Sequence, residues 1–171
     1  KALDEELIED AIICKNDFER NKLWEIRENA AENEKKELIN SQAKKCLKHD
    51  ISLPINNIEK FHLETQKMIS SKIKNTRTIF FGHLGDGNLH YNIFGNGKGD
   101  DGFENQSKNI TENLYKIIKK LNGSFSAEHG IGQLKKDNLK FFKDPVAYNL
   151  MKNIKYMIDP KNIMNPGKIL I

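Results

Sequence analysis

The stretch FFGHLGDGNLHYNIF, residues 80–94, decides the fold of this chain because two β-favouring runs flank a glycine-rich centre. Asp86-Gly87 between such runs predicts a two-residue type I′ hairpin turn. With that centre, His83 faces His90 directly across the strand pair, with Cβ atoms about 4.5–5.5 Å apart. The sequence therefore predicts an antiparallel hairpin that brings two imidazoles together.

The alternation of side chains along each strand separates this hairpin into two faces. The apolar face comprises Phe80, Leu84, Leu89, Tyr91 and Ile93, and the polar face comprises His83, Asn88, His90 and Asn92. A slip of one residue would move the apolar set to the solvent side, so the pattern favours this pairing. Two histidines on a polar face are consistent with either a metal or catalytic site or a solvated surface, and further ligands must decide between these interpretations.

A second motif, GSFSAEHGIG at residues 123–132, ends a strand-like piece with an acidic and an imidazole side chain, Glu128 and His129. The glycines that follow predict the start of a helix, so both residues are expected at a strand-to-helix junction. Adjacent side chains of an extended segment diverge, which favours separate roles. Two histidines and one carboxylate form the set that binds divalent metals and leaves positions open for substrate. Helix capping by Glu128 and His129 is the simpler interpretation of this motif alone.

The rest of the chain supplies helices and one further strand, judged from apolar periodicity and turn residues. The predicted strand covers residues 50–53, and the predicted helices cover residues 3–13, 19–40, 55–73 and 110–121. Asp144-Pro145 starts a last helix as N-cap and first-turn proline, and Asp159-Pro160 ends it. Gly123 is the expected C-cap of the preceding helix, and residues 95–102 form a loop. The pattern predicts an α+β fold, an antiparallel sheet with helices packed on one face.

Composition restricts the class of protein. The 171 residues, 37% hydrophobic and 30% charged, suit one globular domain over residues 1–171. No apolar run approaches the roughly 18 residues of a transmembrane helix, and the first residues lack the regions of a signal peptide. Cys14 and Cys46 have no metal-ligand spacing, which indicates a reduced cytoplasmic protein, with peripheral attachment to the inner membrane left open. The net charge of +4, spread over dispersed lysine pairs, does not predict a nucleic-acid surface.

Three motifs in order, HLGDGNLH at residues 83–90, AEHGIG at 127–132 and NPGK at 165–168, resemble the C-terminal domain of FAD-linked oxidases of the vanillyl-alcohol-oxidase type. The resemblance is to the family of D-lactate dehydrogenase, D-2-hydroxyglutarate dehydrogenase and the glycolate oxidase flavin subunit. It covers nearly all of the chain and implies a ferredoxin-like cap domain. No segment resembles the family's FAD-binding domain and no initiating Met is present, so the chain is expected to be truncated at its N-terminal side and to partner the missing FAD-binding domain of the same polypeptide.

The resemblance implies roles for particular residues. It makes His83, His90 and Glu128 ligands of a divalent metal (Zn, Mn or Fe), and His129 the base that takes the proton of the substrate hydroxyl. A 2-hydroxy acid would chelate the metal through its carboxylate and hydroxyl oxygens, which lowers the hydroxyl pKa. Histidine titrates near neutral pH and suits this task. Hydride would pass to FAD, which the resemblance assigns mainly to the missing domain.

The resemblance also implies contacts to a small anionic 2-hydroxy acid. Arg27 offers a planar two-pronged donor and Lys48 a point charge for the carboxylate, and Asn92 shares the polar face of the hairpin. Asn165, in the NPGK motif, is expected near the flavin as a cofactor-binding residue. Ala31 stands where hydroxyglutarate-type enzymes have a hydroxyl residue, which favours lactate or glycolate over hydroxyglutarate.

The sequence therefore predicts the substrate- and metal-binding domain of an FAD-dependent dehydrogenase that oxidises a D-2-hydroxy acid, such as D-lactate or glycolate, to the 2-oxo acid. This domain alone is expected to be inactive. Two other interpretations stay open: a non-catalytic metal-binding or assembly subunit without its own flavin domain, and a non-haem iron oxygenase. The electron acceptor after the flavin is open among a quinone, a cytochrome and an electron-transfer flavoprotein.

Overall fold

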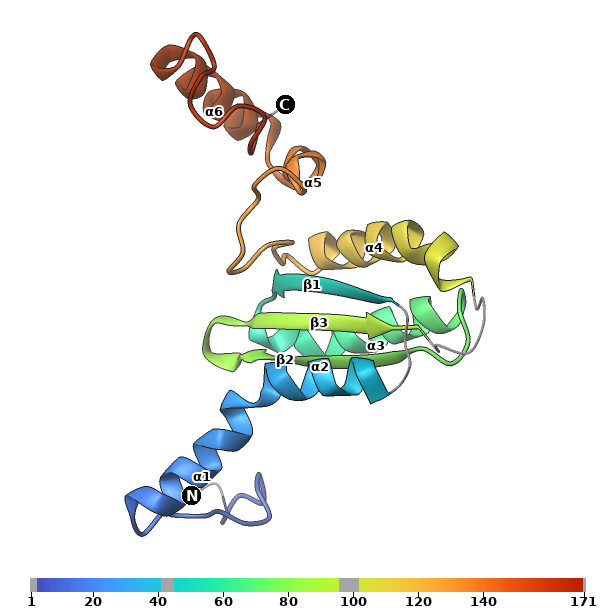
Figure 1. Ribbon diagram of the computed structural model, residues 1–171, viewed down its shortest axis with the longest axis vertical. Coiled ribbons are helices and arrows are strands. Elements are labelled where there is room, and N and C mark those ends of the chain that lie inside the picture. Colours follow the sequence, from blue (N-terminus) through green and yellow to red (C-terminus); the bar gives the residue numbers. More distant parts are fainter. Residues whose placement is uncertain (1–2, 41–44, 96–101, 171) are drawn as a thin grey trace. The chain divides into compact units, whose positions relative to one another are not determined.

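The computed structural model describes residues 3–40, 45–95 and 102–170. Its contacts divide the chain into two units, Lys1–Asn40 and Ser41–Ile171. The first unit contains two helices, α1 (Asp17–Glu28) and α2 (Ala30–Asn40), labelled in Figure 1. The predicted loop at 95–102 lies, over residues 96–101, outside the described residues.

Two predictions for the first unit are wrong. Residues 3–13, all described, form turns and irregular backbone instead of a helix, because like charges four residues apart, such as Glu5 and Glu9, repel each other on a helix. The predicted helix over residues 19–40 is interrupted at Asn29, whose φ of −79° and ψ of 1° leave the helical range. Asparagine is a weak helix former, so two shorter helices replace one.

The second unit contains a three-stranded antiparallel sheet in the order β1-β3-β2. The strands are β1 (Cys46–Ser52), β2 (Arg77–His83) and β3 (Asn88–Phe94), with α3 (Ile58–Ser70) after β1 and α4 (Phe103–Lys120) after β3. An isolated bridge pairs Ser124, which follows α4, with Ser52 at the end of β1. The order β-α-β-β-α, with that bridge in the place of the last strand, resembles ferredoxin-like folds, and the antiparallel sheet with helices confirms the predicted α+β class.

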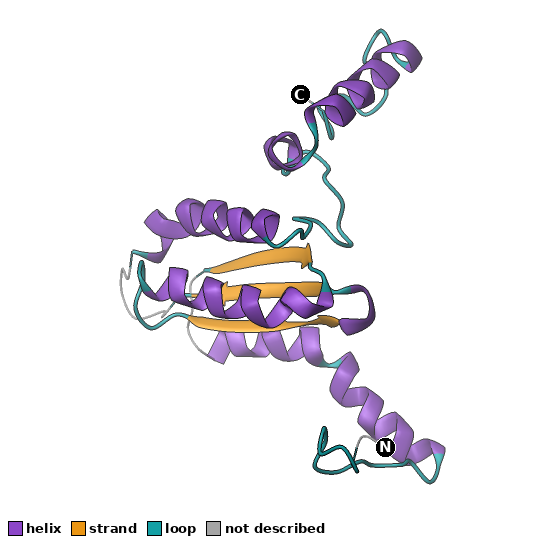
Figure 2. Ribbon diagram, turned by 180° about the vertical axis from the view of Figure 1, so that it is seen from behind, coloured by secondary structure: helices purple, strands orange, loops and turns teal. Residues whose placement is uncertain are grey.

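The helices α3 and α4 pack on one face of the sheet, as Figure 2 shows from behind. The fully buried side chains of this core come from both layers: Ile51, Phe61, Ile69, Tyr91, Ile93, Ile110, Leu114 and Ile118. Because side chains alternate along each strand, the residues between these core positions face the opposite side. The site described below lies on that opposite side.

The hairpin between β2 and β3 differs from the predicted one in its turn and its register. A 3-10 turn, η2 (Leu84–Asp86), precedes Gly87, which takes the left-handed conformation with φ 68°. A type I′ turn needs positive φ at both central residues, whereas Asp86 belongs to the 3-10 turn. His83 therefore pairs with Asn88, and not with His90 as predicted. The partner of His83 is displaced by two residues from the predicted one, and because side chains alternate along a strand, His83 and His90 still share a face of the sheet.

The segment after α4 also corrects two expectations. The left-handed residue that ends α4 is Asn122 (φ 57°), and not Gly123, while the Gly123 N–H bonds to the Ile118 carbonyl in a Schellman arrangement. Gly123 is needed for close packing instead, because a Cβ there would lie 2.6 Å from the Ser52 oxygen. The next helix, α5 (Lys136–Phe142), starts later than the glycine-bounded start predicted near residues 130–132.

The last helix, α6 (Pro145–Ile158), begins and ends as predicted. The Asp144 carboxylate accepts hydrogen bonds from the N–H groups of Val146 and Ala147, at 2.9 and 3.0 Å. This N-cap satisfies amides that have no partner inside the helix. None of the helices within the described ranges is both long and apolar enough to cross a membrane.

The buried His49 makes the core sensitive to pH. Its Nδ1–H donates to the Tyr91 carbonyl at 3.1 Å, since a carbonyl only accepts, and its Nε2 accepts from the Thr111 hydroxyl at 3.2 Å. Both bonds fit the neutral ring. Burial lowers the pKa of His49 from 6.5 to about 4, because burial disfavours the charged form.

We predict that the free energy of unfolding falls as the pH drops from 6.5 to 5. In that range the unfolded chain protonates residue 49 and the folded chain does not, which lowers stability by about 1.4 kcal/mol per pH unit, or about 2 kcal/mol. Urea unfolding at several pH values measures this slope. His49→Gln is the control, and its free energy of unfolding should fall by about 2 kcal/mol less than that of the wild type over the same pH range. Equal pH dependence in both proteins would contradict the prediction.

Candidate functional site

The site lies on the sheet face opposite α3 and α4, where neighbouring strands bring polar side chains together. Asp50 of β1 pairs with His90 of the central strand β3. On the other side of His90, its partner is Phe81 of β2, and the two rings lie 5.3 Å apart between centroids. The central position of His90 therefore follows from the strand order β1-β3-β2.

The Asp50 carboxylate connects this sheet to the segment that carries Glu128 and His129. It accepts hydrogen bonds from the backbone N–H groups of Ala127, Glu128 and His129, at 3.2, 3.1 and 3.0 Å. The side chain is almost fully buried. Burial by itself would raise the pKa of Asp50, but these hydrogen bonds outweigh it and hold the pKa below its usual value. Asp50 is therefore a buried carboxylate that fixes the path of residues 127–129.

The Glu128 side chain lies between the two histidines of the hairpin. Its Oε1 is 3.3 Å from His83 Nδ1, and its Oε2 is 3.6 Å from His90 Nε2. The Asn88 amide donates a hydrogen bond to Glu128 Oε1, while the other amide atom, Asn88 Oδ1, is buried without a hydrogen-bond partner in the described part of the chain. The structure thus brings together His83, His90 and Glu128, the three residues predicted as metal ligands.

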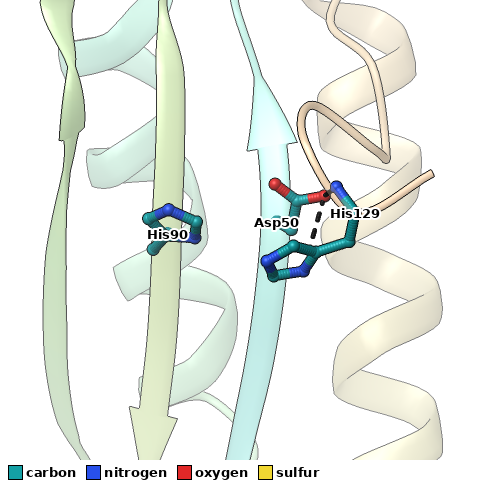
Figure 3. Close-up of side chains that lie close together, drawn as sticks. All are labelled: Asp50, His90 and His129. Atoms are coloured by element: carbon teal, nitrogen blue, oxygen red, sulfur yellow. Dashed lines mark hydrogen bonds and ion pairs between the residues drawn. The ribbon is translucent and has the colours of Figure 1, made fainter. Parts of the chain in front are cut away.

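His129 lies beside this group and is largely exposed. Its ring stacks on His90 with 5.7 Å between centroids and 30° between planes. Its Nδ1 is 3.7 Å from Asp50 Oδ2. Figure 3 shows Asp50 and His129 side by side, with His90 on the neighbouring strand. Exposure of the ring leaves it accessible to a ligand.

One group of described side chains has the spacing of a metal site, and a second, overlapping group has suitable donor types. Ligand atoms of Asp50, His90 and His129 lie within 4.8 Å of one another, but the Asp50 oxygens already accept three backbone N–H groups. Glu128 faces the other two histidines with different oxygens, Oε1 at 3.3 Å from His83 Nδ1 and Oε2 at 3.6 Å from His90 Nε2. These three residues do not bring one ligand atom each within 4.8 Å of one another, so binding one ion would require their side chains to move closer together. The donor set of two imidazoles and a carboxylate suits Zn, Mn or Fe.

The residues predicted to bind substrate fall in both units. Lys48 pairs with Asn92 across β1 and β3, two positions from the Asp50–His90 pair and on the same face. Arg27 lies in α1 of the first unit, where it donates to Glu28 Oε1 at 2.9 Å. The side chain of Ala31 is outside the described part of the structure. The binding roles of Arg27, Lys48 and Asn92 stay predictions.

Asn165 lies in a turn after α6 and has a left-handed backbone with φ 49°. The turn is bonded to the segment that follows His129. Ile169 N–H donates to the Gly132 carbonyl at 2.7 Å, and Lys168 Nζ donates to Gln133 Oε1, also at 2.7 Å. The NPGK motif is therefore joined to the segment that carries the histidine.

Two residues that matter to the site were not assigned a role from sequence. Asp50 was predicted only as a strand residue, although an acid in a predicted strand, directly before Ile51, is an available signal. Lys135 was not singled out, and its ammonium lies 3.6 Å from Asp50 Oδ2. The contact between Lys135 and Asp50 could not be found from spacing, because the two residues are 85 positions apart in the chain.

Comparison with known proteins agrees with this fold and these motifs. Residues 1–169 match the family described as FAD linked oxidases, C-terminal domain. The D-2-hydroxyglutarate dehydrogenase of Stutzerimonas stutzeri (strain A1501) is 33% identical over 94% of this chain and 33% of its own length. The mitochondrial D-2-hydroxyglutarate dehydrogenase of Rattus norvegicus is 32% identical over 99% of this chain and 30% of its own length.

A third relative, a probable mitochondrial D-2-hydroxyglutarate dehydrogenase of Oryza sativa subsp. indica, is 32% identical over 99% of this chain and 28% of its own length. The chain thus spans about a third of the length of these relatives. The family match extends over all three motifs and both units. On this evidence the chain belongs to the family of the C-terminal domains of FAD-linked oxidases.

Proposed function

We propose that the chain is the substrate- and metal-binding domain of an FAD-dependent dehydrogenase that converts a D-2-hydroxy acid to the 2-oxo acid. The observation that carries the proposal is the Glu128 carboxylate between His83 and His90, with the exposed His129 ring beside them. The family description and the names of the relatives support the reaction class. Because the chain spans a third of those relatives, the activity is proposed for the whole protein.

We assign His83, His90 and Glu128 as the residues that would hold a divalent metal, Zn, Mn or Fe. When bound, the metal would polarise the substrate hydroxyl and carboxylate oxygens as a Lewis acid. The Asn88 amide keeps the Glu128 carboxylate directed at the two imidazoles. These residues thus act by presenting three donors from one face of the sheet and one adjoining segment.

His129 is the proposed base. Its Nδ1 faces the Asp50 carboxylate at 3.7 Å, which favours a proton on Nδ1 and leaves Nε2 to accept the hydroxyl proton of the substrate. The exposed ring can reach a small molecule bound at the neighbouring ligands. Asn165 is the proposed contact of this chain to FAD, which when bound would supply the hydride-accepting chemistry that side chains lack.

The substrate is an anion in this proposal. Lys48 lies two positions along β1 from Asp50 and is exposed, so its ammonium can attract a carboxylate. Arg27 and Asn92 are the further proposed contacts. The lack of a hydroxyl at Ala31 favours D-lactate or glycolate, whereas the relatives are named for D-2-hydroxyglutarate, so all three acids belong in the test.

We predict that the purified chain binds close to one equivalent of Zn²⁺ or Mn²⁺. His83→Ala and His90→Ala should each weaken binding by at least about 100-fold, since loss of groups that only orient metal ligands already costs 10–100-fold. Elemental analysis and titration calorimetry measure both effects. His62→Ala is the matched control, because His62 belongs to α3 and bonds to the Tyr91 hydroxyl. Full metal content in either His83 or His90 variant would contradict the assignment.

We predict that the protein expressed from its complete reading frame, supplied with divalent metal, shows reduction of its flavin by a D-2-hydroxy acid. Stopped-flow absorbance with D-lactate, glycolate and D-2-hydroxyglutarate measures the rate. His129→Gln should lower that rate by about 10²–10⁴-fold at unchanged metal content, because a positioned base contributes that much. The L-enantiomer of lactate serves as substrate control. Bound flavin that none of the acids reduces would refute the proposed activity.

A further inference from the structure

We propose that Asp50 is the positioning residue of this site. From the middle of β1, its carboxylate fixes the backbone of residues 127–129 and so sets the directions of Glu128 and His129. The roles given to Glu128 and His129 rest on the proposed function. The contacts of Asp50 are features of the structure itself.

The segment that Asp50 holds has little other structure to define it. After the single bridge at Ser124, the described backbone is irregular until α5 begins at Lys136. An irregular segment lacks the regular hydrogen-bond partners of a helix or sheet. Three successive N–H groups, of residues 127–129, find their acceptor in one carboxylate. The course of this segment therefore depends on Asp50.

Because Asp50 lies beside His90 in the sheet, its hydrogen bonds to residues 127–129 align Glu128 with the histidines. Asp50 and His90 are direct partners in the β1–β3 ladder, so their Cβ atoms are about 5 Å apart. The strand pairing thus fixes the carboxylate relative to His90, and the carboxylate fixes the backbone of Glu128. The Glu128 oxygens then lie 3.3 Å from His83 and 3.6 Å from His90. A displaced segment would open these distances.

Asp50 is itself held by Lys135, which contacts the same oxygen, Oδ2, that accepts from the N–H groups of Ala127 and His129. The Lys135 ammonium lies 3.6 Å from Asp50 Oδ2 and donates to the Phe125 carbonyl at 3.3 Å and the Ser126 hydroxyl at 3.2 Å. Asp50 therefore has both a cation and three backbone amides as partners. A buried carboxylate with such partners has one orientation, which a positioning residue requires.

The test compares variants of the 171-residue chain by amide hydrogen exchange and by zinc titration calorimetry. Asp50→Asn keeps the size of the side chain and removes the charge and one acceptor. We expect exchange at amides 127–129 to rise at least 10-fold and zinc affinity to fall 10–100-fold. Asp144→Asn is the matched control, because that carboxylate also accepts two backbone N–H groups but at the start of α6. It should leave both readouts at wild-type values.

A second variant separates positioning from simple loss of stability. Asp50→Glu keeps the charge and the acceptors but is longer by one methylene, so amides 127–129 should stay protected while the segment moves. Zinc affinity should then fall at least 10-fold in a chain that remains folded. This variant decides the question if Asp50→Asn does not fold.

The outcomes for Asp50 and for the metal site are distinguishable. Wild-type zinc affinity in a folded Asp50→Glu or Asp50→Asn chain would overturn the positioning role, as would unchanged exchange at amides 127–129 in Asp50→Asn. If the wild-type chain binds no zinc, the proposed metal site fails. Faster exchange confined to those amides in Asp50→Asn would still support the positioning of this segment by Asp50.

Discussion

One buried carboxylate organises the site. Asp50 would be costly to bury alone, because a charge removed from water needs partners of comparable strength. The N–H groups of residues 127–129 and the ammonium of Lys135 supply them. The same bonds give an irregular segment a defined path across the sheet. Stability of the buried charge and geometry of the site therefore depend on one another.

The strand order of the sheet also determines the geometry of the site. Because α3 and α4 cover one face, the second face presents the side chains between the core positions, His90 and Asp50 among them. The β1-β3-β2 order places His90 in the centre, with a partner on each side. His83 reaches Glu128 from the end of β2. The chemistry thus follows from strand order together with one long-range hydrogen-bonded contact.

The sequence predicted those features that depend on local pattern. Alternation placed His83 and His90 on one face, and this survived the wrong turn because the actual register differs by two residues. The Asp144 N-cap of α6 was equally predictable from the sequence, since its hydrogen bonds reach only two or three residues along the chain. The hydrogen bonds of Asp50 could not be predicted from the sequence, because they join residues 77 to 79 positions apart in the chain. Loop geometry at Leu84–Asp86 likewise depends on tertiary bonds, such as that from the Leu53 N–H to the Gly87 carbonyl.

The most direct test of this account is a crystal structure of the chain grown with Zn²⁺, with anomalous scattering recorded at the zinc edge. The account predicts one strong peak about 2.0–2.2 Å from donors of His83, His90 and Glu128, with the Asp50 carboxylate still bonded to amides 127–129. A peak coordinated by the Asp50 carboxylate itself, or no peak in crystals that retain those Asp50 bonds, would contradict it.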